Sequence, residues 1–368
     1  METIEMNRTG GKMNSKAWRT ILAAVLLSVV TASTTSAADT VERKSVPAPL
    51  TGTITEISRE SITITVGSLK KATTIPANDV ANVRWDQEPA SLNLLRADEK
   101  AGHLQKAHDG YKNLLGSIPA GQKNLKTDVA FLAARSLAKI ALVDPAKLDE
   151  AVAQLDAFRQ SNESNFRYYE SLEHLSRAYV AQKKVAEART IYGLLSQAPW
   201  PDYKAGVQIA EARARLITGD VDGAQASFEA IIAAPATEPE QQRRRQEALL
   251  GKVACLQAKK QHEEAVKLLD EFILDLPVDA TAAQAEAYLR QGDSLRAVGK
   301  GKAALLAYLH VDMLFAQEES LHAESLYQLA QLWPTVGHPD RAAEAVSRLQ
   351  SRYPNSEWTK RLPGARRE

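Results

Sequence analysis

The feature that most constrains the fold of this chain is a pattern of three residues that recurs along most of its length. A small residue is followed four positions later by an aromatic or bulky apolar residue, and three positions after that by another apolar residue. The pattern occurs at Ala107/Tyr111/Leu114, Ala151/Leu155/Phe158, Ala188/Tyr192/Leu195, Ala224/Phe228/Ile231, Ala265/Leu269/Phe272, Ala304/Tyr308/Val311 and Ala342/Val346/Leu349. Positions i, i+4 and i+7 share one face of an α-helix, so the pattern predicts a series of related helices.

Each triplet is predicted to lie on the second helix of a helical hairpin. Two antiparallel helices approach closely only where a side chain is short, and the large residue one turn further on fills the wider gap. The preceding helices carry a complementary pattern of large, small and large residues. That pattern is clearest at Leu172, Leu175, Ser176 and Tyr179, at Tyr288, Gly292 and Leu295, and at Leu326, Leu329, Ala330 and Trp333. Repeated hairpins of this kind stack into an α-solenoid.

These large, small and large positions resemble the signature of the tetratricopeptide repeat (TPR) family. Pro119, Pro277 and Pro354 stand where that family often ends its second helix, since proline cannot continue a helix. The triplets lie further apart than the family's period of about 34 residues, which implies longer helices or loops. The resemblance implies a mainly α fold, a TPR-like α-solenoid of about seven helical hairpins over residues 91–360, followed by a disordered tail over 361–368.

A second, smaller module is predicted before the repeats, over residues 47–88. Ile62, Ile64 and Val66 alternate with threonines, the period of a half-buried strand. Turn residues separate four predicted strands near 51–58, 61–67, 71–75 and 80–86, with an extra strand over 41–47 left open against a linker over 39–46. The module resembles small SH3-like or Sm-like barrels, and a curled sheet or barrel is expected. Because about 40 residues make a marginal core alone, the sheet should pack on the first helices through Trp85 and Leu92.

Residues 1–38 are interpreted as a cleavable signal peptide. Lys16 and Arg19 precede a short apolar stretch from Ile21 to Val30, and Ser36-Ala37-Ala38 or Thr35-Ser36-Ala37 supplies small residues for cleavage. The apolar stretch is too short to span a bilayer, and Met13 is an alternative start. A signal, a β module and helical repeats together resemble exported envelope TPR proteins of bacteria, including planctomycete-type bacteria. The prediction is a periplasmic or secreted protein without a stable membrane span.

Composition and motifs argue against several function classes. The 46 basic and 45 acidic residues give a net charge of +1, which offers no global attraction to nucleic acid. The basic run Arg243-Arg244-Arg245 is interpreted as a solvated helix start. The seven histidines show no metal-ligand spacing, and Cys255 is interpreted as a buried, inert thiol. We therefore predict no enzyme, no metal and no cofactor.

The predicted function is to hold a protein or peptide partner. In a helical solenoid the first helices line a concave face, and aligning the repeats by their signature places six candidate binding residues there. They are Arg177, Arg213, Arg290, Asp293, Tyr327 and Gln331. The alternative is a structural component that self-associates through the convex face or the terminal hairpin, which an exposed apolar patch near Trp358 would favour. The oligomeric state is left open.

Overall fold

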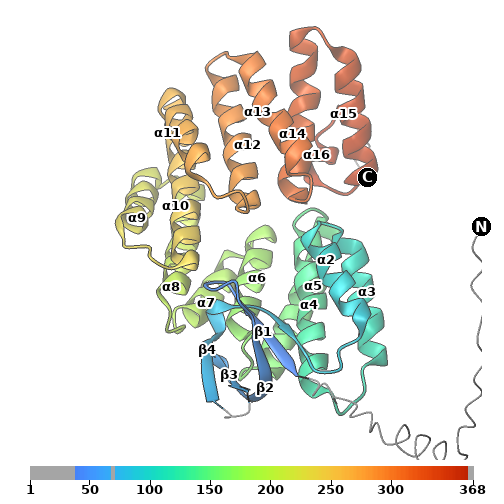
Figure 1. Ribbon diagram of the computed structural model, residues 1–368. Helices are drawn as coiled ribbons and strands as arrows, with labels where there is room; N and C mark the ends of the chain where they lie inside the picture. Colours follow the sequence, from blue (N-terminus) through green and yellow to red (C-terminus); the bar gives the residue numbers. More distant parts are fainter. Residues whose placement is uncertain (1–37, 68–70, 364–368) are drawn as a thin grey trace, which may run out of the picture. The chain divides into compact units, whose positions relative to one another are not determined.

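Helical hairpins follow one another along most of the chain (Figure 1). The computed structural model describes residues 38–67 and 71–363. Within these ranges the helices form seven consecutive hairpins, each made of two neighbouring helices. In chain order the hairpins are α2 (Ala90–Lys100) with α3 (Leu104–Ser117), α4 (Lys123–Ala141) with α5 (Leu148–Ser161), α6 (Tyr168–Ala181) with α7 (Val185–Leu195), and α8 (Pro201–Ile217) with α9 (Val221–Ala233). The last three are α10 (Pro239–Ala258) with α11 (His262–Asp275), α12 (Thr281–Ala297) with α13 (Gly301–Leu314), and α14 (Glu319–Leu332) with α15 (Pro339–Arg352). The short helix α16 (Glu357–Lys360) follows. The predicted solenoid of about seven hairpins behind a small β module is confirmed.

The recurring triplets lie where they were predicted, on the second helix of each hairpin. Every triplet residue is buried except Val346, which is half-buried. Close packing of the first helix depends on small residues in two places. The Cβ atom that Gly251 lacks would overlap the ring of Phe228, and that of Gly292 would lie 2.5 Å from the ring of Tyr308. These glycines let neighbouring helices approach an aromatic ring directly.

The β module is a five-stranded antiparallel sheet with the strand order β4-β3-β2-β1-β5. Its strands are β1 (Asp39–Arg43), β2 (Leu50–Ile57), β3 (Ser61–Val66), β4 (Lys71–Pro76) and β5 (Val80–Arg84). The four predicted strands are confirmed. The predicted linker over 39–46 is wrong for its first half, because β1 pairs with both β2 and β5. Since the edge strands β4 and β5 are not paired with each other in the described residues, the module is an open sheet and not a closed barrel.

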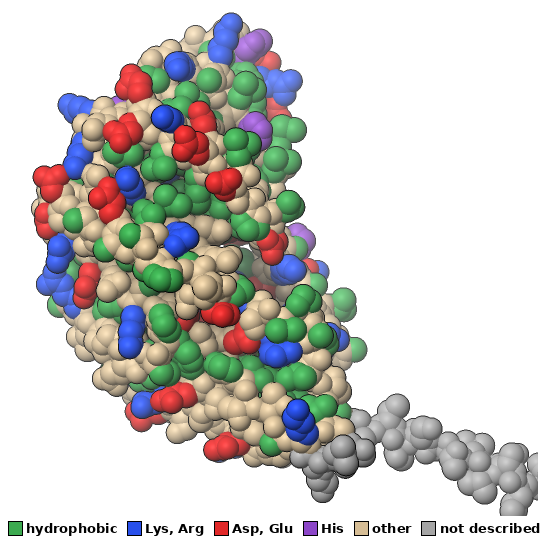
Figure 2. All heavy atoms as spheres, turned by 60° about the vertical axis from the view of Figure 1, so that its left-hand side comes forward, with side chains coloured by type: hydrophobic (Ala, Val, Ile, Leu, Met, Phe, Trp, Pro, Cys, Tyr) green, Lys and Arg blue, Asp and Glu red, His purple; other side chains and the backbone are tan. Residues whose placement is uncertain are grey.

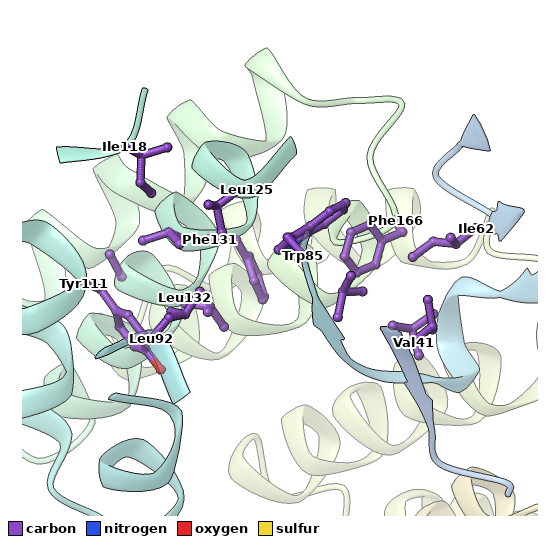
Figure 3. Packing of buried hydrophobic residues seen from close by; sticks show 14 of the residues in the cluster. Val41, Ile62, Trp85, Leu92, Tyr111, Ile118, Leu125, Phe131, Leu132 and Phe166 are labelled. Atoms are coloured by element: carbon purple, nitrogen blue, oxygen red, sulfur yellow. The ribbon is translucent and has the colours of Figure 1, made fainter. Parts of the chain in front are cut away.

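The sheet and the first helices share one hydrophobic core. That core contains Val41, Ile62 and Ile64 from the sheet together with Trp85, Leu92 and residues of α3 and α4. Figure 3 shows Trp85 with the helix residues Leu125 and Phe131 on one side and Phe166, Ile62 and Val41 on the other. The expected packing of the sheet on the repeats through Trp85 and Leu92 is confirmed.

The last hairpin returns to the first two hairpins, a contact that sequence reasoning did not predict. Val143, in the turn after α4, packs against a cluster that contains Leu326 of α14 and Trp358 of α16. The side-chain amide of Asn355 donates a hydrogen bond of 2.9 Å to Asp144 in the same turn. Leu362 belongs to this cluster and is 5% exposed, so the predicted disordered tail begins too early at residue 361. Residues 364–368 of that tail, and residues 1–37 of the predicted signal, lie outside the described ranges.

Replacing Gly292 with Ala is expected to lower the free energy of unfolding by about 1–2 kcal/mol. The added methyl group would meet the buried ring of Tyr308, and such overpacking outweighs the gain in helix propensity of up to about 1 kcal/mol. Urea denaturation followed by circular dichroism measures the change.

Gly193→Ala is the matched control, because only its chain neighbours and the backbone of its own helix lie close to the absent Cβ of this glycine, and no other atom of the described residues lies within 4 Å. That variant should be neutral or more stable by up to about 1 kcal/mol. Equal stabilisation of both variants would contradict the close-packing role of Gly292.

Candidate functional site

Two of the six predicted binding residues, Arg177 and Arg213, line one groove. The groove has a volume of about 650 Å³ and lies between α6, α7 and α8. Arg177 is on α6 and Arg213 on α8, and both are exposed. Most lining residues come from the C-terminal halves of α6 and α8 and from α7. The structure thus brings together two arginines that are 36 positions apart in the sequence.

Local packing explains why α6 and α8 leave space between their C-terminal halves. An aromatic cluster joins their N-terminal ends: the ring of Tyr169 lies 5.6 Å from that of Trp200 and 5.7 Å from that of Tyr203, centroid to centroid. The backbone of Trp200 is extended, and Pro201 at the first position of α8 is preorganised for a helix start. The helices are therefore held together at this end, and the groove opens towards the other.

The wall of the groove is largely apolar and partly exposed. Val180 of α6 is 42% exposed, Val185 of α7 is 46% exposed and Ile217 of α8 is 77% exposed. Buried parts of Ala188, Tyr192 and Val207 complete the wall. Sequence reasoning missed these aliphatic residues. The sequence could have indicated them, because they are apolar residues near helix ends that lie outside the positions of the repeat core.

Four arginines line the groove, namely Arg177, Arg189, Arg213 and Arg215. None of their four guanidinium groups forms an ion pair or a hydrogen bond with another residue in the ranges 38–67 and 71–363. Other arginines of the first helices differ in this respect. Arg135 of α4 pairs with Glu99 at 2.9 Å, and Arg290 of α12 pairs with Glu324 at 3.0 Å.

A cluster of ion pairs lies beside the groove, around a polar cavity of about 190 Å³. We call it the Arg244 cluster, and its members are Lys44, Glu173, Glu240, Arg243, Arg244 and Glu247. Arg244 forms ion pairs with Glu173 and Glu247, and its Nε donates to the carbonyl oxygen of Asp202 at 3.0 Å. Lys44 of the β module pairs with Glu240 at 3.3 Å, so the sheet contributes to this cluster.

The Arg244 cluster corrects the interpretation of Arg243-Arg244-Arg245 as a solvated helix start. Arg244 is 3% exposed, because α10 begins at Pro239 and its first turns pack against α6 and α8. Arg243 is paired with Glu240 at 2.7 Å. The face in Figure 2 likewise carries Lys and Arg side chains next to Asp and Glu side chains.

Burial and charge shift the pKa values of groups around the Arg244 cluster. Burial alone would raise the pKa of Glu173, but the positive charges of Arg244 and Arg177 outweigh it and lower this pKa to about 2. Burial and the charge of Arg177 lower the pKa of His174 to about 3. Glu173 is therefore ionised and His174 neutral at pH 7.

The other four predicted binding residues do not line the groove. Arg290 pairs with Asp293 at 2.7 Å, and Asp293 also accepts a hydrogen bond of 2.9 Å from the hydroxyl of Tyr308. Tyr327 packs against Trp358 with ring centroids 5.3 Å apart, in the cluster that joins the last hairpin to Val143. Gln331 lies on α14 and is half-buried. These positions serve the packing of the solenoid or lie away from the groove.

The described residues hold no cluster of three or more His, Cys, Asp or Glu side chains that could bind a metal ion. Cys255 is fully buried, as predicted, and burial raises the pKa of its thiol. A buried thiol with a raised pKa is a poor nucleophile, because the thiolate is the reactive form. Among the helices that the structure describes, none has the length and apolar character to cross a membrane.

Comparison with known proteins gives likenesses only among solved structures, because no family model and no curated protein matches the sequence. A tetratricopeptide repeat protein from Parabacteroides merdae is 17% identical over 72% of this chain and 93% of its own, with a TM-score of 0.43. PilW, a type IV pilus biogenesis factor, is 18% identical over 62% of this chain and 95% of its own, with a TM-score of 0.40. A Rap protein complexed with competence and sporulation factor is 15% identical over 73% of this chain and 76% of its own, with a TM-score of 0.44. Values this low assign neither a family nor a function.

Replacing Arg244 with Met is expected to lower the free energy of unfolding by about 3–5 kcal/mol at pH 7, because Glu173 and Glu247 would lose a buried partner. The deficit should shrink at pH 3. In the wild type, the lowered pKa of Glu173 gives stability that is present above pH 4.5 and is lost as the pH falls towards 2. Without Arg244 the carboxyl of Glu173 takes up its proton at a higher pH. The variant therefore loses less free energy of unfolding than the wild type does when the pH falls from 7 to 3. Urea denaturation at both pH values measures the deficit.

Arg341→Met is the control, because its pair with Glu344 is exposed and spans 3.4 Å. That variant should change stability by less than about 0.5 kcal/mol. An equally small effect of Arg244→Met would show that the Arg244 cluster does not hold α6, α8 and α10 together.

Proposed function

We propose that this chain is a binding protein that holds a segment of a protein partner in the groove between α6, α7 and α8. The observation that carries the proposal is an unfilled groove with exposed aliphatic walls and arginines that have no partner among the described residues. Its volume of about 650 Å³ is within the usual range for ligand sites. The proposal assigns binding and no catalysis.

The walls of the groove suit the binding of a peptide segment. Val180, Val185 and Ile217 offer apolar surface that a bound side chain would remove from water, and a few buried anchors supply most of the affinity in such interfaces. The Arg244 cluster and the aromatic cluster around Tyr169 hold α6 and α8 at one end of the groove. A preformed site loses less conformational entropy when a partner binds.

Polar substitution of two exposed wall residues tests the groove. A peptide selected on the wild-type protein from a randomised display library should bind at least about tenfold more weakly to the Val180→Gln/Ile217→Gln variant, because the apolar anchor is lost and the charge is unchanged. Fluorescence anisotropy with the labelled peptide measures the affinity.

Leu274→Gln/Leu314→Gln is the matched control. These leucines are 85% and 59% exposed on α11 and α13, outside the groove. The control should bind the peptide within about twofold of the wild type. Failure to select any peptide, or equal loss in both variants, would overturn the proposed groove.

Self-association is a second candidate function, favoured by a separate set of exposed apolar residues. This set lies on or near α11 and α13 and consists of Leu274, Val278, Leu306, Met313 and Leu314, each between 58% and 92% exposed. The patch expected near Trp358 gives no support, because Trp358 is half-buried against Tyr327. Light scattering that gives a dimer for the wild type and a monomer for the Leu274→Gln/Leu314→Gln control would favour this candidate.

We further propose that the chain acts in the periplasm or outside the cell, because residues 1–38 have the composition of a signal peptide. Protein isolated from the envelope or medium of an expressing bacterium should have lost this segment. The mature chain should begin at Ala38 if cleavage follows Ala37, and at Asp39 if cleavage follows Ala38. The intact mass, measured by mass spectrometry of the purified protein, distinguishes these products from the full chain.

A charge placed in the apolar stretch provides the control for export. Leu26→Arg interrupts the run from Ile21 to Val30, so the variant should stay in the cytoplasm at its full mass. Wild-type protein that keeps its full mass in the cytoplasm would contradict the proposed export.

A further inference from the structure

The groove carries more positive charge than its own residues neutralise. Among the residues that line it, the acids are Glu173, Glu211 and Glu247. Glu173 and Glu247 are already paired within the Arg244 cluster, where equal numbers of acidic and basic residues balance each other. Among the lining residues this leaves one acid, Glu211, against the four arginines Arg177, Arg189, Arg213 and Arg215. A partner that binds here meets a basic surface.

Arg177 and Arg213 act on the same part of the groove. Burial raises the pKa of Tyr192 on α7, and the charges of Arg213 and Arg177 oppose this rise. Burial would also raise the pKa of Glu247 on α10, but nearby arginines, Arg177 and Arg213 among them, lower it. Both arginines therefore face the region between α6, α7 and α8, although they belong to different hairpins.

Each of these two arginines is followed, about one helical turn later, by an exposed apolar residue. Val180 comes three residues after Arg177 on α6, and Ile217 comes four residues after Arg213 on α8. Residues at these spacings lie on one face of a helix. Each wall thus presents a guanidinium group next to an aliphatic side chain.

We propose that the segment held in the groove is acidic and amphipathic, with carboxylates that pair with Arg177 and Arg213 beside apolar side chains that contact Val180 and Ile217. This inference rests on the proposed binding function of the groove. Guanidinium groups bind carboxylates through two parallel hydrogen bonds, which gives orientation as well as affinity.

A peptide fits these walls better than a nucleic acid does. Nucleic acids also carry anions that arginine binds, but single strands depend on aromatic faces for base stacking. The exposed apolar residues of the groove wall are aliphatic, and the two tyrosines that line it, Tyr192 and Tyr203, are each 8% exposed.

The test is a selection of peptides from a randomised display library, performed on three forms of the protein. The wild type should enrich peptides in which Asp or Glu lies within four positions of apolar residues. The Arg177→Glu/Arg213→Glu variant should enrich Lys or Arg at those positions instead. The control is Lys267→Glu/Lys302→Glu, which makes the same change in net charge at two exposed lysines outside the groove and should enrich the same acidic peptides as the wild type.

Affinity measurements make the test quantitative. An enriched acidic peptide should bind the charge-reversed variant at least about tenfold more weakly than the wild type, and its Asp→Asn and Glu→Gln analogue should show a similar loss with the wild type. Circular dichroism and thermal unfolding check that the charge-reversed variant is folded.

Several results would overturn the acidic partner. Enrichment of neutral or basic peptides on the wild type would do so, as would an equal loss of affinity in the lysine control. Displacement of the peptide by a short oligothymidine at lower concentration than by the unlabelled peptide would point to a nucleic acid. If neutral peptides bind the wild type and bind the Val180→Gln/Ile217→Gln variant more weakly, the proposed groove is supported and the proposed acidic partner is wrong. If no peptide is enriched, the proposed binding function of the groove is itself wrong.

Discussion

The start of the solenoid depends on one buried carboxylate, that of Asp128 on α4. Its side chain accepts hydrogen bonds of 3.0 Å from the indole of Trp85 and from the guanidinium of Arg167, and Arg96 of α2 lies 3.8 Å away. Trp85 follows the last strand of the sheet, and Arg167 directly precedes α6. A carboxylate that is 1% exposed is stable only with such partners. The sheet, α2, α4 and the start of α6 therefore have to assemble together, and this fixes the helix that forms one wall of the groove.

The hairpins could be predicted because their signal is local. Close contact between two helices needs a short side chain, and the triplets from Ala107/Tyr111/Leu114 onwards repeat that requirement inside each unit. Features that depend on distant partners could not be predicted in this way. The sequence leaves a strand over 41–47 open against a linker over 39–46, and only the pairing with β2 and β5 on both sides shows that β1 is a strand. The contact of Asn355 with Asp144 joins residues 211 positions apart, and no local pattern indicates it.

Only part of the candidate site could be anticipated from the sequence, because two of the six predicted residues, Arg177 and Arg213, line the groove and the other four do not. The repeat register places Arg177, Arg213 and Arg290 on equivalent helices, but it does not show which arginine has a partner. Arg290 forms an ion pair with Glu324 on the next first helix, 34 positions away, whereas Arg177 and Arg213 form no ion pair with an acid in the described residues. The difference depends on packing between hairpins. The same packing buries Arg244, which looks like part of a solvated basic run when only its neighbours in the sequence are considered.

The groove arises because neighbouring first helices are bound to each other unevenly. The rings of Tyr169, Trp200 and Tyr203 join the N-terminal ends of α6 and α8, and the pair of Arg244 with Glu173 ties α10 to α6 nearby. Within the part of the chain that the structure describes, the C-terminal halves have no such aromatic or ionic link, and they carry Val180 and Ile217, whose apolar surface remains in contact with water. Exposed apolar surface costs free energy until it is covered. A segment that covers it gains this free energy without rebuilding the helices, because their other ends are already fixed. Rigidity at one end of the helix pair and unfilled space at the other are thus two results of the same packing.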